Sequence, residues 1–300
     1  MFLNRHLRQG VAAIPSYSLA NSFEQRAAAF RLIYQSYLSS GLGTCNPLRL
    51  RVTPFQLLAT SQIFLASIPT SIPNELEKWD AFVHPEEFEP TSRSGLQEQV
   101  VATITLVNDG QLGLPMEGIF GREVQLLRRE GRQIAEVTCL ATSTTDARKF
   151  LQIFTQLTRI LAQFSRYEGA QNLLISVHPR HAKFYSRYFG FRPLSNRVAL
   201  CPHVKDKPAV ALNLNFDLYD LEQPQSWHAI FGTWEPQEEL QPTVIPSSEC
   251  ALWREVSKVS CAELTPLLMR IDPNLEEERR SRHVPETIPI TFPGFRRRAA

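Results

Sequence analysis

One acidic residue, Glu136, lies inside a mostly apolar segment, Ile134-Ala-Glu-Val-Thr-Cys-Leu-Ala141. A carboxylate in such a segment is costly to bury unless it is hydrogen-bonded or has a function. Partial burial raises the pKa of a carboxyl group, which brings it toward the range of a general base. Two interpretations follow. Either Glu136 removes a proton from a nucleophile, or it lies on an edge strand and faces water.

Two histidines, His178 and His181, follow a predicted strand at 170–177 and are alternative general bases. Otherwise they cap a helix or lie on the surface. Together with Cys201 and His203 they make a conceivable metal set. Zinc sites of that kind need more closely paired ligands, so we expect no bound metal.

The cysteines are five in number, irregularly spaced and without a Cys-x-x-Cys pair. This pattern indicates reduced thiols and a cytoplasmic protein rather than a disulfide framework. Alternation along a strand turns Cys139 away from Glu136, so we expect Cys139 to be a small core residue and not a nucleophile.

The elements expected to position these residues form an α/β protein. A helix begins at the capping box Ser22-Phe-Glu-Gln25 and ends before Gly41. Residues 112–121 are expected to form a loop. The remaining predicted strands lie at 61–67, 99–107, 134–141, 170–177 and 209–217, and the remaining helices at 123–129, 147–167 and 180–189.

Composition limits the function. The chain has 300 residues, of which 43% are hydrophobic, and a formal net charge of +2. These values exclude a wholly disordered protein, and they give no global field that would attract nucleic acid. The uncharged stretch 52–74 contains three prolines and several polar residues, which favours a loop and a buried strand over a membrane span.

Proline placement suggests a division of the chain. Nine of the 21 prolines lie after residue 220. We expect an N-terminal segment (1–21), a compact body (22–217) with an acidic insertion (71–98), and a Pro-rich, irregular C-terminal extension (218–300) with one amphipathic helix near 262–270.

The order strand, helix, strand, then a Tyr-bearing helix ending Gly190-Phe191, resembles the core of GNAT-type acyltransferases. More of the chain resembles bacterial long-chain N-acyl amino acid synthases, relatives of the acyl-homoserine-lactone synthases. The resemblance extends over roughly residues 24–216. It is carried by Phe30–Leu38, Arg51-Val-Thr-Pro-Phe55, Val101–Val107, Leu112-Gly-Leu-Pro-Met116, Gly131–Leu140, Val177–Phe191 and Pro208–Leu214.

The resemblance implies a GNAT-like mixed sheet with covering helices, and transfer of a long-chain acyl group from acyl carrier protein to the amino group of an amino acid. It implies that Glu136 is the base and Tyr185 the acid for the departing thiolate. The pantetheine arm would lie between the strands at 134–141 and 171–177, with backbone N–H groups near Leu140 and Ala141 holding the thioester oxygen. No cofactor is permanently bound, because acyl-phosphopantetheine is part of the donor.

The sequence departs from the GNAT pattern in two places. Residues 143–148 lack the glycines of a coenzyme A pyrophosphate loop, whereas the single phosphate of a carrier protein can be held by the helix N-terminus with Arg148 and Lys149. Tyr185 lies five residues before Gly190 rather than four, so Ser186 takes the usual tyrosine position.

Carrier proteins are acidic, so a basic patch is expected to dock them. The candidates are Arg122, Arg128, Arg129, Arg148, Lys149, Arg159 and Arg166. The alternative for these residues is an ordinary solvated helix face. An acylated product would also allow peripheral membrane contact.

Other functions remain open at this stage. One is an acyltransferase that resembles a lactone synthase or uses coenzyme A, with another acceptor. Another is an acyl-binding module without turnover. The sequence does not specify the acceptor, the acyl length or the oligomeric state.

Overall fold

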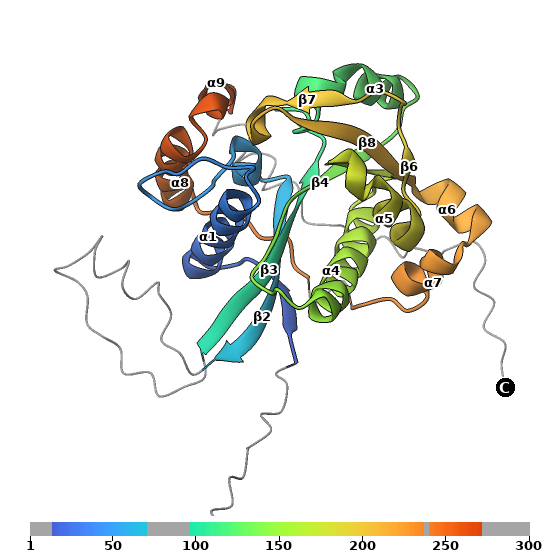
Figure 1. Ribbon diagram of the computed structural model, residues 1–300, viewed down its shortest axis with the longest axis horizontal. Coiled ribbons are helices and arrows are strands. Elements are labelled where there is room, and N and C mark those ends of the chain that lie inside the picture. The colour runs from blue at the N-terminus through green and yellow to red at the C-terminus, as the bar shows by residue number, and fades with distance from the viewer. Residues whose placement is uncertain (1–13, 71–96, 237–239, 272–300) are drawn as a thin grey trace, which may run out of the picture.

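The computed structural model describes residues 14–70, 97–236 and 240–271 (Figure 1). The strands in these ranges form one mixed sheet in the order β1-β2-β3-β4-β5-β8-β6, and β7 pairs with β8 as well. Only β4 and β5 pair in parallel, and the other pairs are antiparallel. The bounds are β1 (Ser16–Leu19), β2 (Ser61–Thr70), β3 (Gln97–Asn108), β4 (Ile134–Thr142), β5 (Asn172–Val177), β6 (Arg192–Pro193), β7 (Ala199–Cys201) and β8 (Lys207–Asn215).

Helices cover both faces of the sheet. Short 3-10 turns at Pro54–Leu57, Pro202–Val204 and Ala262–Leu264 complete the described elements. The helix bounds are α1 (Phe23–Ser39), α3 (Glu117–Arg129), α4 (Ala147–Tyr167), α5 (Pro179–Phe189), α6 (Phe216–Glu222), α7 (Gln225–Phe231), α8 (Ser247–Ser260) and α9 (Thr265–Leu268).

Alternating side chains of the strands build two separate cores. In β2, Ile63 and Leu65 pack on the side of α1, α3 and α8, which we call the α1-side core. Phe64 and Ala66 pack on the side of α4 to α7, which we call the α4-side core. Figure 1 shows α1 and α4 on opposite sides of the central strands. The sheet is therefore buried on both faces at its centre, which is why its strands are almost continuously apolar.

The predicted mixed sheet with covering helices is confirmed, and α4 has the predicted bounds. The N-terminal cap predicted for α1 is confirmed, but one of the two hydrogen bonds of the capping box has a different donor. The Ser22 hydroxyl accepts from the Gln25 backbone N–H (3.3 Å), while the Gln25 side chain accepts from Asn21 rather than from Ser22 (2.9 Å). Gly190 ends α5 at φ 75, where a side chain would also overlap the Tyr219 ring.

The loop predicted over 112–121 is wrong in its second half, because α3 begins at Glu117. Gly118 and Gly121 are typical of loops and each costs about 1 kcal/mol in a helix relative to alanine. The helix forms nevertheless, with non-helical dihedral angles at Phe120, whose side chain is completely buried in the α1-side core. Burial of an aromatic ring outweighs the glycine penalty.

The segment 240–271 packs against the N-terminal helix. Trp253 of α8 is fully buried, stacked on Phe23 and edge-on to Phe30, with ring centroids 4.9 Å apart in both pairs. Arg26 of α1 forms a bidentate ion pair with Glu249 of α8, at 2.5 and 2.6 Å. Neither α6, α7 nor α8 was among the predicted elements. The predicted helix near 262–270 consists of a 3-10 turn followed by α9.

Parts of the predicted organisation lie outside the described residues. These include all but the end of the acidic insertion at 71–98, where β3 begins at Gln97, and the last 29 residues of the predicted extension. Among the described helices, none is long and apolar enough to cross a membrane.

Candidate active site

A β-bulge interrupts β4 next to the predicted site. In the pairing with β3, Thr138 lies opposite Thr105 and Ala141 opposite Thr103, so Cys139 and Leu140 together face a single residue. Cys139 has φ 52, a left-handed conformation that non-glycine residues seldom adopt. A bulge of this kind bends the strand and frees one peptide unit from the ladder.

The bulge coincides with the point where β4 and β5 stop pairing. Their parallel pairs extend from Ile134–Asn172 to Val137–Ile175, although β4 continues to Thr142 and β5 to Val177. Beyond Val137, β4 pairs only with β3 among the described strands. We call the end of this strand pair, where the pairing stops, the fork. The prediction that a pantetheine arm lies between these strands stays a prediction.

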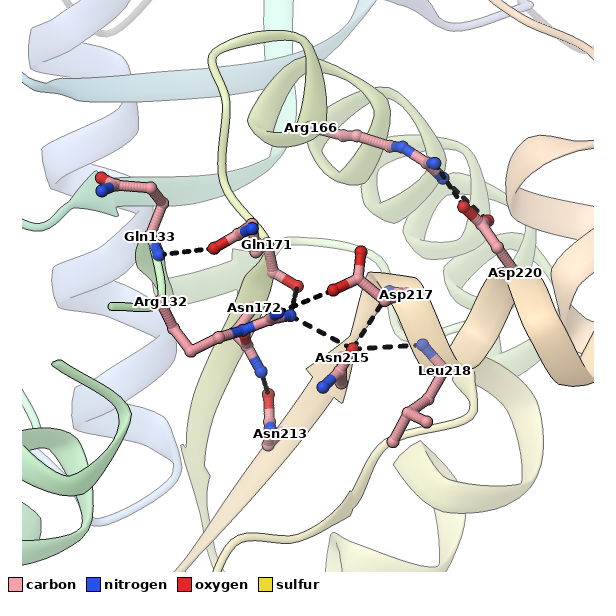
Figure 2. A network of polar contacts seen from close by, with 10 residues as sticks. All are labelled: Arg132, Gln133, Arg166, Gln171, Asn172, Asn213, Asn215, Asp217, Leu218 and Asp220. Carbon is pink, nitrogen blue, oxygen red and sulfur yellow. Dashed lines mark hydrogen bonds and ion pairs between the residues drawn. The ribbon is translucent and has the colours of Figure 1, made fainter. Parts of the chain in front are cut away.

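A polar network holds the closed end of this fork (Figure 2). Arg132, just before β4, donates to the side chain of Asn172 at the start of β5 (2.7 Å) and to Asp217 in α6 (2.7 Å). Asn172 in turn donates to Asn213 of β8 (3.0 Å). The two strands are therefore tied together at their N-terminal ends and separate at their C-terminal ends.

Glu136 is only 2% exposed and points into the α1-side core. One carboxylate oxygen accepts from the backbone N–H of Met116, at 2.8 Å. Burial, with a smaller contribution from the charge of Glu117, raises the pKa of Glu136 from 4.5 to about 8, although the hydrogen bond from the Met116 N–H acts in the opposite direction. The proposed edge-strand position is wrong, because β4 is a central strand.

The loop that carries Met116 is fixed by a second polar cluster. The Arg128 guanidinium forms ion pairs with Asp109 (2.6 Å) and with Glu117. The Glu117 carboxylate also accepts from the Leu114 backbone N–H, at 2.7 Å. Arg128 therefore holds the loop that positions Glu136, and its charge is already matched by two carboxylates.

Cys139 lies on the same side of the sheet as Glu136, which contradicts the expectation from strict alternation. Cys139 is itself the first residue of the bulge, and its left-handed backbone turns its side chain to the side of Glu136, where it is 5% exposed within the α1-side core. Burial raises the pKa of its thiol. A neutral buried thiol fits the predicted core role.

Arg51 and Tyr37 also belong to this side of the sheet, and sequence reasoning did not assign them to the site. Arg51 is 8% exposed, and its guanidinium carbon lies 5.0 Å from the centroid of the Tyr37 ring. One of its terminal nitrogens donates to the His203 carbonyl, at 3.0 Å. Arg51 and Tyr37 both lower the pKa of the Cys139 thiol, which shows how close they lie to it.

A cavity of about 850 Å³ lies next to His203, whose carbonyl accepts from Arg51. It is bounded by the loop at 109–118, by the 3-10 turn and α9 of the C-terminal segment, and by Phe55 and His203. Glu136 is not one of the described residues that line this cavity. Pro115 and Glu117, the neighbours of Met116 in the chain, do line it.

Tyr185 packs in the α4-side core rather than beside Glu136. Its ring contacts Phe154, Phe184 and Phe189. Burial raises its pKa to about 12, which keeps the hydroxyl protonated at neutral pH. No interaction between Tyr185 and Glu136 occurs among the described side chains, so the two would have to act on a substrate from different faces of the fork.

The two histidines lie where β5 ends and α5 begins. His178 is the N-cap of α5, and its Nδ1 accepts from the Arg180 backbone N–H at 3.2 Å. Burial lowers the pKa of His181, with contributions from Arg180 and His178. Within the described residues no group of three or more metal-binding side chains comes together.

The basic candidates divide into two sets. Arg159 donates to the Thr233 carbonyl (2.7 Å) and pairs with Glu235 (3.0 Å). Arg166 pairs with Asp220, as Figure 2 shows, and Arg128 is engaged as described above. The exposed members of the set are Arg122, Arg129, Arg148 and Lys149.

The mixed sheet with its covering helices has the GNAT-like fold. Residues 92–215 match the model of the family described as N-acyl amino acid synthase FeeM. This match confirms the predicted resemblance to the N-acyl amino acid synthases, and the protein is an N-acyltransferase.

One solved structure with a TM-score of 0.50 shows this fold, and two others align at lower scores. The structure of FeeM, an N-acyl amino acid synthase from uncultured soil microbes, aligns with 68% of this chain and 93% of its own length, at 20% identity and a TM-score of 0.50. The acyl-homoserine-lactone synthase LasI aligns with 74% of this chain and 98% of its own, at 13% identity and a TM-score of 0.46. An acyl-CoA N-acyltransferase from Pseudomonas aeruginosa covers 67% of this chain and 99% of its own, at 14% identity and a TM-score of 0.39. None of the curated protein sequences matches the chain.

Proposed function

We propose that the protein transfers a long-chain acyl group from acyl carrier protein to the amino group of an amino acid, with Glu136 as general base. The observation that carries this proposal is the burial of Glu136 beside an opened strand pair. A carboxyl group with a pKa of about 8 is partly ionised near neutral pH and basic enough to take a proton from an ammonium group.

In the proposed reaction, Glu136 removes a proton from the acceptor ammonium, directly or through water. The amine nitrogen then attacks the thioester carbonyl, and as the C–N bond forms the nitrogen passes its second proton to water. The oxyanion is stabilised by backbone N–H groups at Leu140 and Ala141, next to the bulge. The C–S bond breaks, and the thiolate leaves with a proton from Tyr185 or from water. The products are an N-acyl amino acid and the free carrier thiol.

The N-terminus of α4 is the proposed site for the donor phosphate. Asp146 caps this helix by accepting from the backbone N–H groups of Arg148 (2.8 Å) and Lys149 (3.2 Å). Because the cap carboxylate takes up these two N–H groups, the exposed side chains of Arg148 and Lys149 would hold a single phosphate and meet an acidic carrier. This arrangement favours a carrier protein over coenzyme A.

The test is a reconstituted assay. Purified protein is incubated with acyl carrier proteins bearing a series of acyl lengths and with the twenty amino acids. Free thiol and N-acyl amino acids, identified by mass spectrometry, are the expected products. Absence of both would refute the proposal, and tight binding of acyl carrier protein without thiol release would select an acyl-binding module instead. Parallel reactions with acyl-coenzyme A measure the preference for the donor.

A further inference from the structure

Arg51 is a buried cation without a carboxylate within ion-pair distance among the described residues, although the charge of Glu263 acts on it from further away. Its guanidinium rests on the Tyr37 ring and donates to one carbonyl, that of His203, while its Nε has no hydrogen-bond partner. An unpaired buried charge is costly, because the groups that solvated it in water have not been replaced. Such a group is typical of a site that awaits an anion.

A second polar atom beside Arg51 is also unsatisfied. The Nδ1 of His203 is buried without a partner, although the backbone carbonyl of the same residue holds Arg51. His203 also lines the 850 Å³ cavity. The Arg51 guanidinium therefore lies one residue away from a space that a solute can occupy.

Arg51 and Glu136 influence the pKa of the same two thiols, those of Cys139 and Cys201. Glu136 raises the pKa of Cys139 and of Cys201, and Arg51 lowers the pKa of each. Both thiols consequently lie within electrostatic reach of one buried acid and one buried base. A buried cation and a buried acid that share these two neighbours form a pattern that is complementary to a small zwitterion.

We infer that Arg51 binds the carboxylate of the amino-acid acceptor and thereby directs its ammonium group toward Glu136. This inference rests on the proposed function, and it makes the free α-carboxylate a requirement for the acceptor. Guanidinium and carboxylate form strong, often bidentate hydrogen bonds, which fix orientation as well as affinity. Arg51 is then a specificity-determining residue that touches the substrate, and Tyr37 positions it.

The wild-type enzyme provides the first test, with acyl carrier protein as donor. Each of the twenty amino acids is offered as the free acid, as its carboxamide and as the decarboxylated amine. Hydrogen bonds to charged groups contribute about 1.5–3 kcal/mol, so removal of the carboxylate should lower kcat/KM about 10- to 150-fold. Equal kcat/KM for the acid and the carboxamide would overturn the inference and leave the proposed function intact. Transfer to none of the three would instead refute the proposed function.

Variants assign the effect to Arg51. In Arg51→Gln the acid and the carboxamide should be used within about threefold of each other, and Arg51→Lys should restore part of the preference because it restores the charge. The matched control is Arg49→Gln, an exposed arginine two residues away, which should leave the preference unchanged.

The variants also separate a structural role from the inferred one. Loss of stability, measured by chemical denaturation, lowers activity toward every acceptor, but it does not change the ratio between acid and carboxamide. A higher KM for acyl carrier protein in Arg51→Lys, with the wild-type acid preference retained, would show that Arg51 serves the donor phosphate and would overturn the inference. If Arg51→Gln does not fold, the wild-type series and Arg51→Lys still decide the question.

Discussion

Replacement of Glu136 by glutamine should stabilise the protein at alkaline pH while it removes activity. Glutamine keeps an oxygen to accept from the Met116 N–H but carries no charge. The pKa of Glu136 is raised from 4.5 to about 8, a gap that corresponds to about 5 kcal/mol as an upper limit. Between these two pH values the folded protein holds a proton that the unfolded chain has lost, so wild-type stability falls as pH rises through this range.

The assay is chemical denaturation of the wild type and of Glu136→Gln at pH 5, 7 and 9. The two proteins should differ least at pH 5. At pH 9 the variant should be more stable by several kcal/mol, up to about 5. A constant difference at all three pH values would refute the reasoning, because it would mean that Glu136 does not change its affinity for protons on folding.

Glu123 supplies a matched control with the opposite sign. It is also buried, but Arg197 holds its carboxylate at 3.1 Å and lowers its pKa. Its contribution to stability is therefore present above its unfolded pKa and is lost as the solution is acidified. Glu123→Gln should destabilise the protein at neutral pH, and the difference should shrink toward acid pH.

Kinetics test the same carboxylate as a base. Wild-type kcat should rise with pH, reach half its maximum near pH 8, where Glu136 is half ionised, and level off above that pH. Glu136→Gln should lower kcat about 10²- to 10⁴-fold and abolish this pH dependence. Full activity with an unchanged profile would move the base to another group, and His178 and His181 would be the next to test.

Three further predictions concern the surroundings of the site. Replacement of both Arg148 and Lys149 by glutamate should raise the KM for acyl carrier protein, more so at low salt, and leave the KM for the amino acid unchanged. Lys258→Glu on α8 is the matched control, and an equal effect of that variant would refute the docking patch. Gly113→Ala should lower both stability and kcat, because Gly113 has φ 71 and a methyl group there would overlap the Glu117 side chain. A variant that unfolds at the wild-type temperature and keeps wild-type activity would contradict this prediction. Trp253→Ala should lower the free energy of unfolding by about 3–5 kcal/mol, measured with urea, and a change below 1 kcal/mol would show that α8 is not part of the core.

The sequence was sufficient to predict elements whose pattern is local. The apolar period of α4, the cap at Ser22 and the glycine that ends α5 are all written in consecutive residues. Prediction failed where packing outweighed local preference. Gly118 and Gly121 lie in a helix because Phe120 is buried, and α8 forms against α1, more than 200 residues away in the chain.

The site shows the same contrast between what a local sequence pattern predicts and what packing decides. Glu136 stands out in the sequence because a charge in an apolar strand is unusual, and the structure places it in the core beside the fork. The bulge has no signature in Thr138-Cys-Leu, so the direction of Cys139 was predicted wrongly. Arg51 is separated from Glu136 by 85 positions, and only the folded chain reveals that both act on the same thiols.

The Arg26–Glu249 ion pair has a consequence for synthesis of the chain. Its two partners are 223 residues apart, and Arg26 is buried in the folded protein. At 5–20 residues per second, a ribosome needs about 10–45 s to reach Glu249 after Arg26 has been made. During that time α1 has neither its counter-ion nor the Trp253 ring that covers it. The apolar face of α1 is therefore covered only after α8 has been made and has packed against it. A chain interrupted before α8 presents that face to chaperones and proteases.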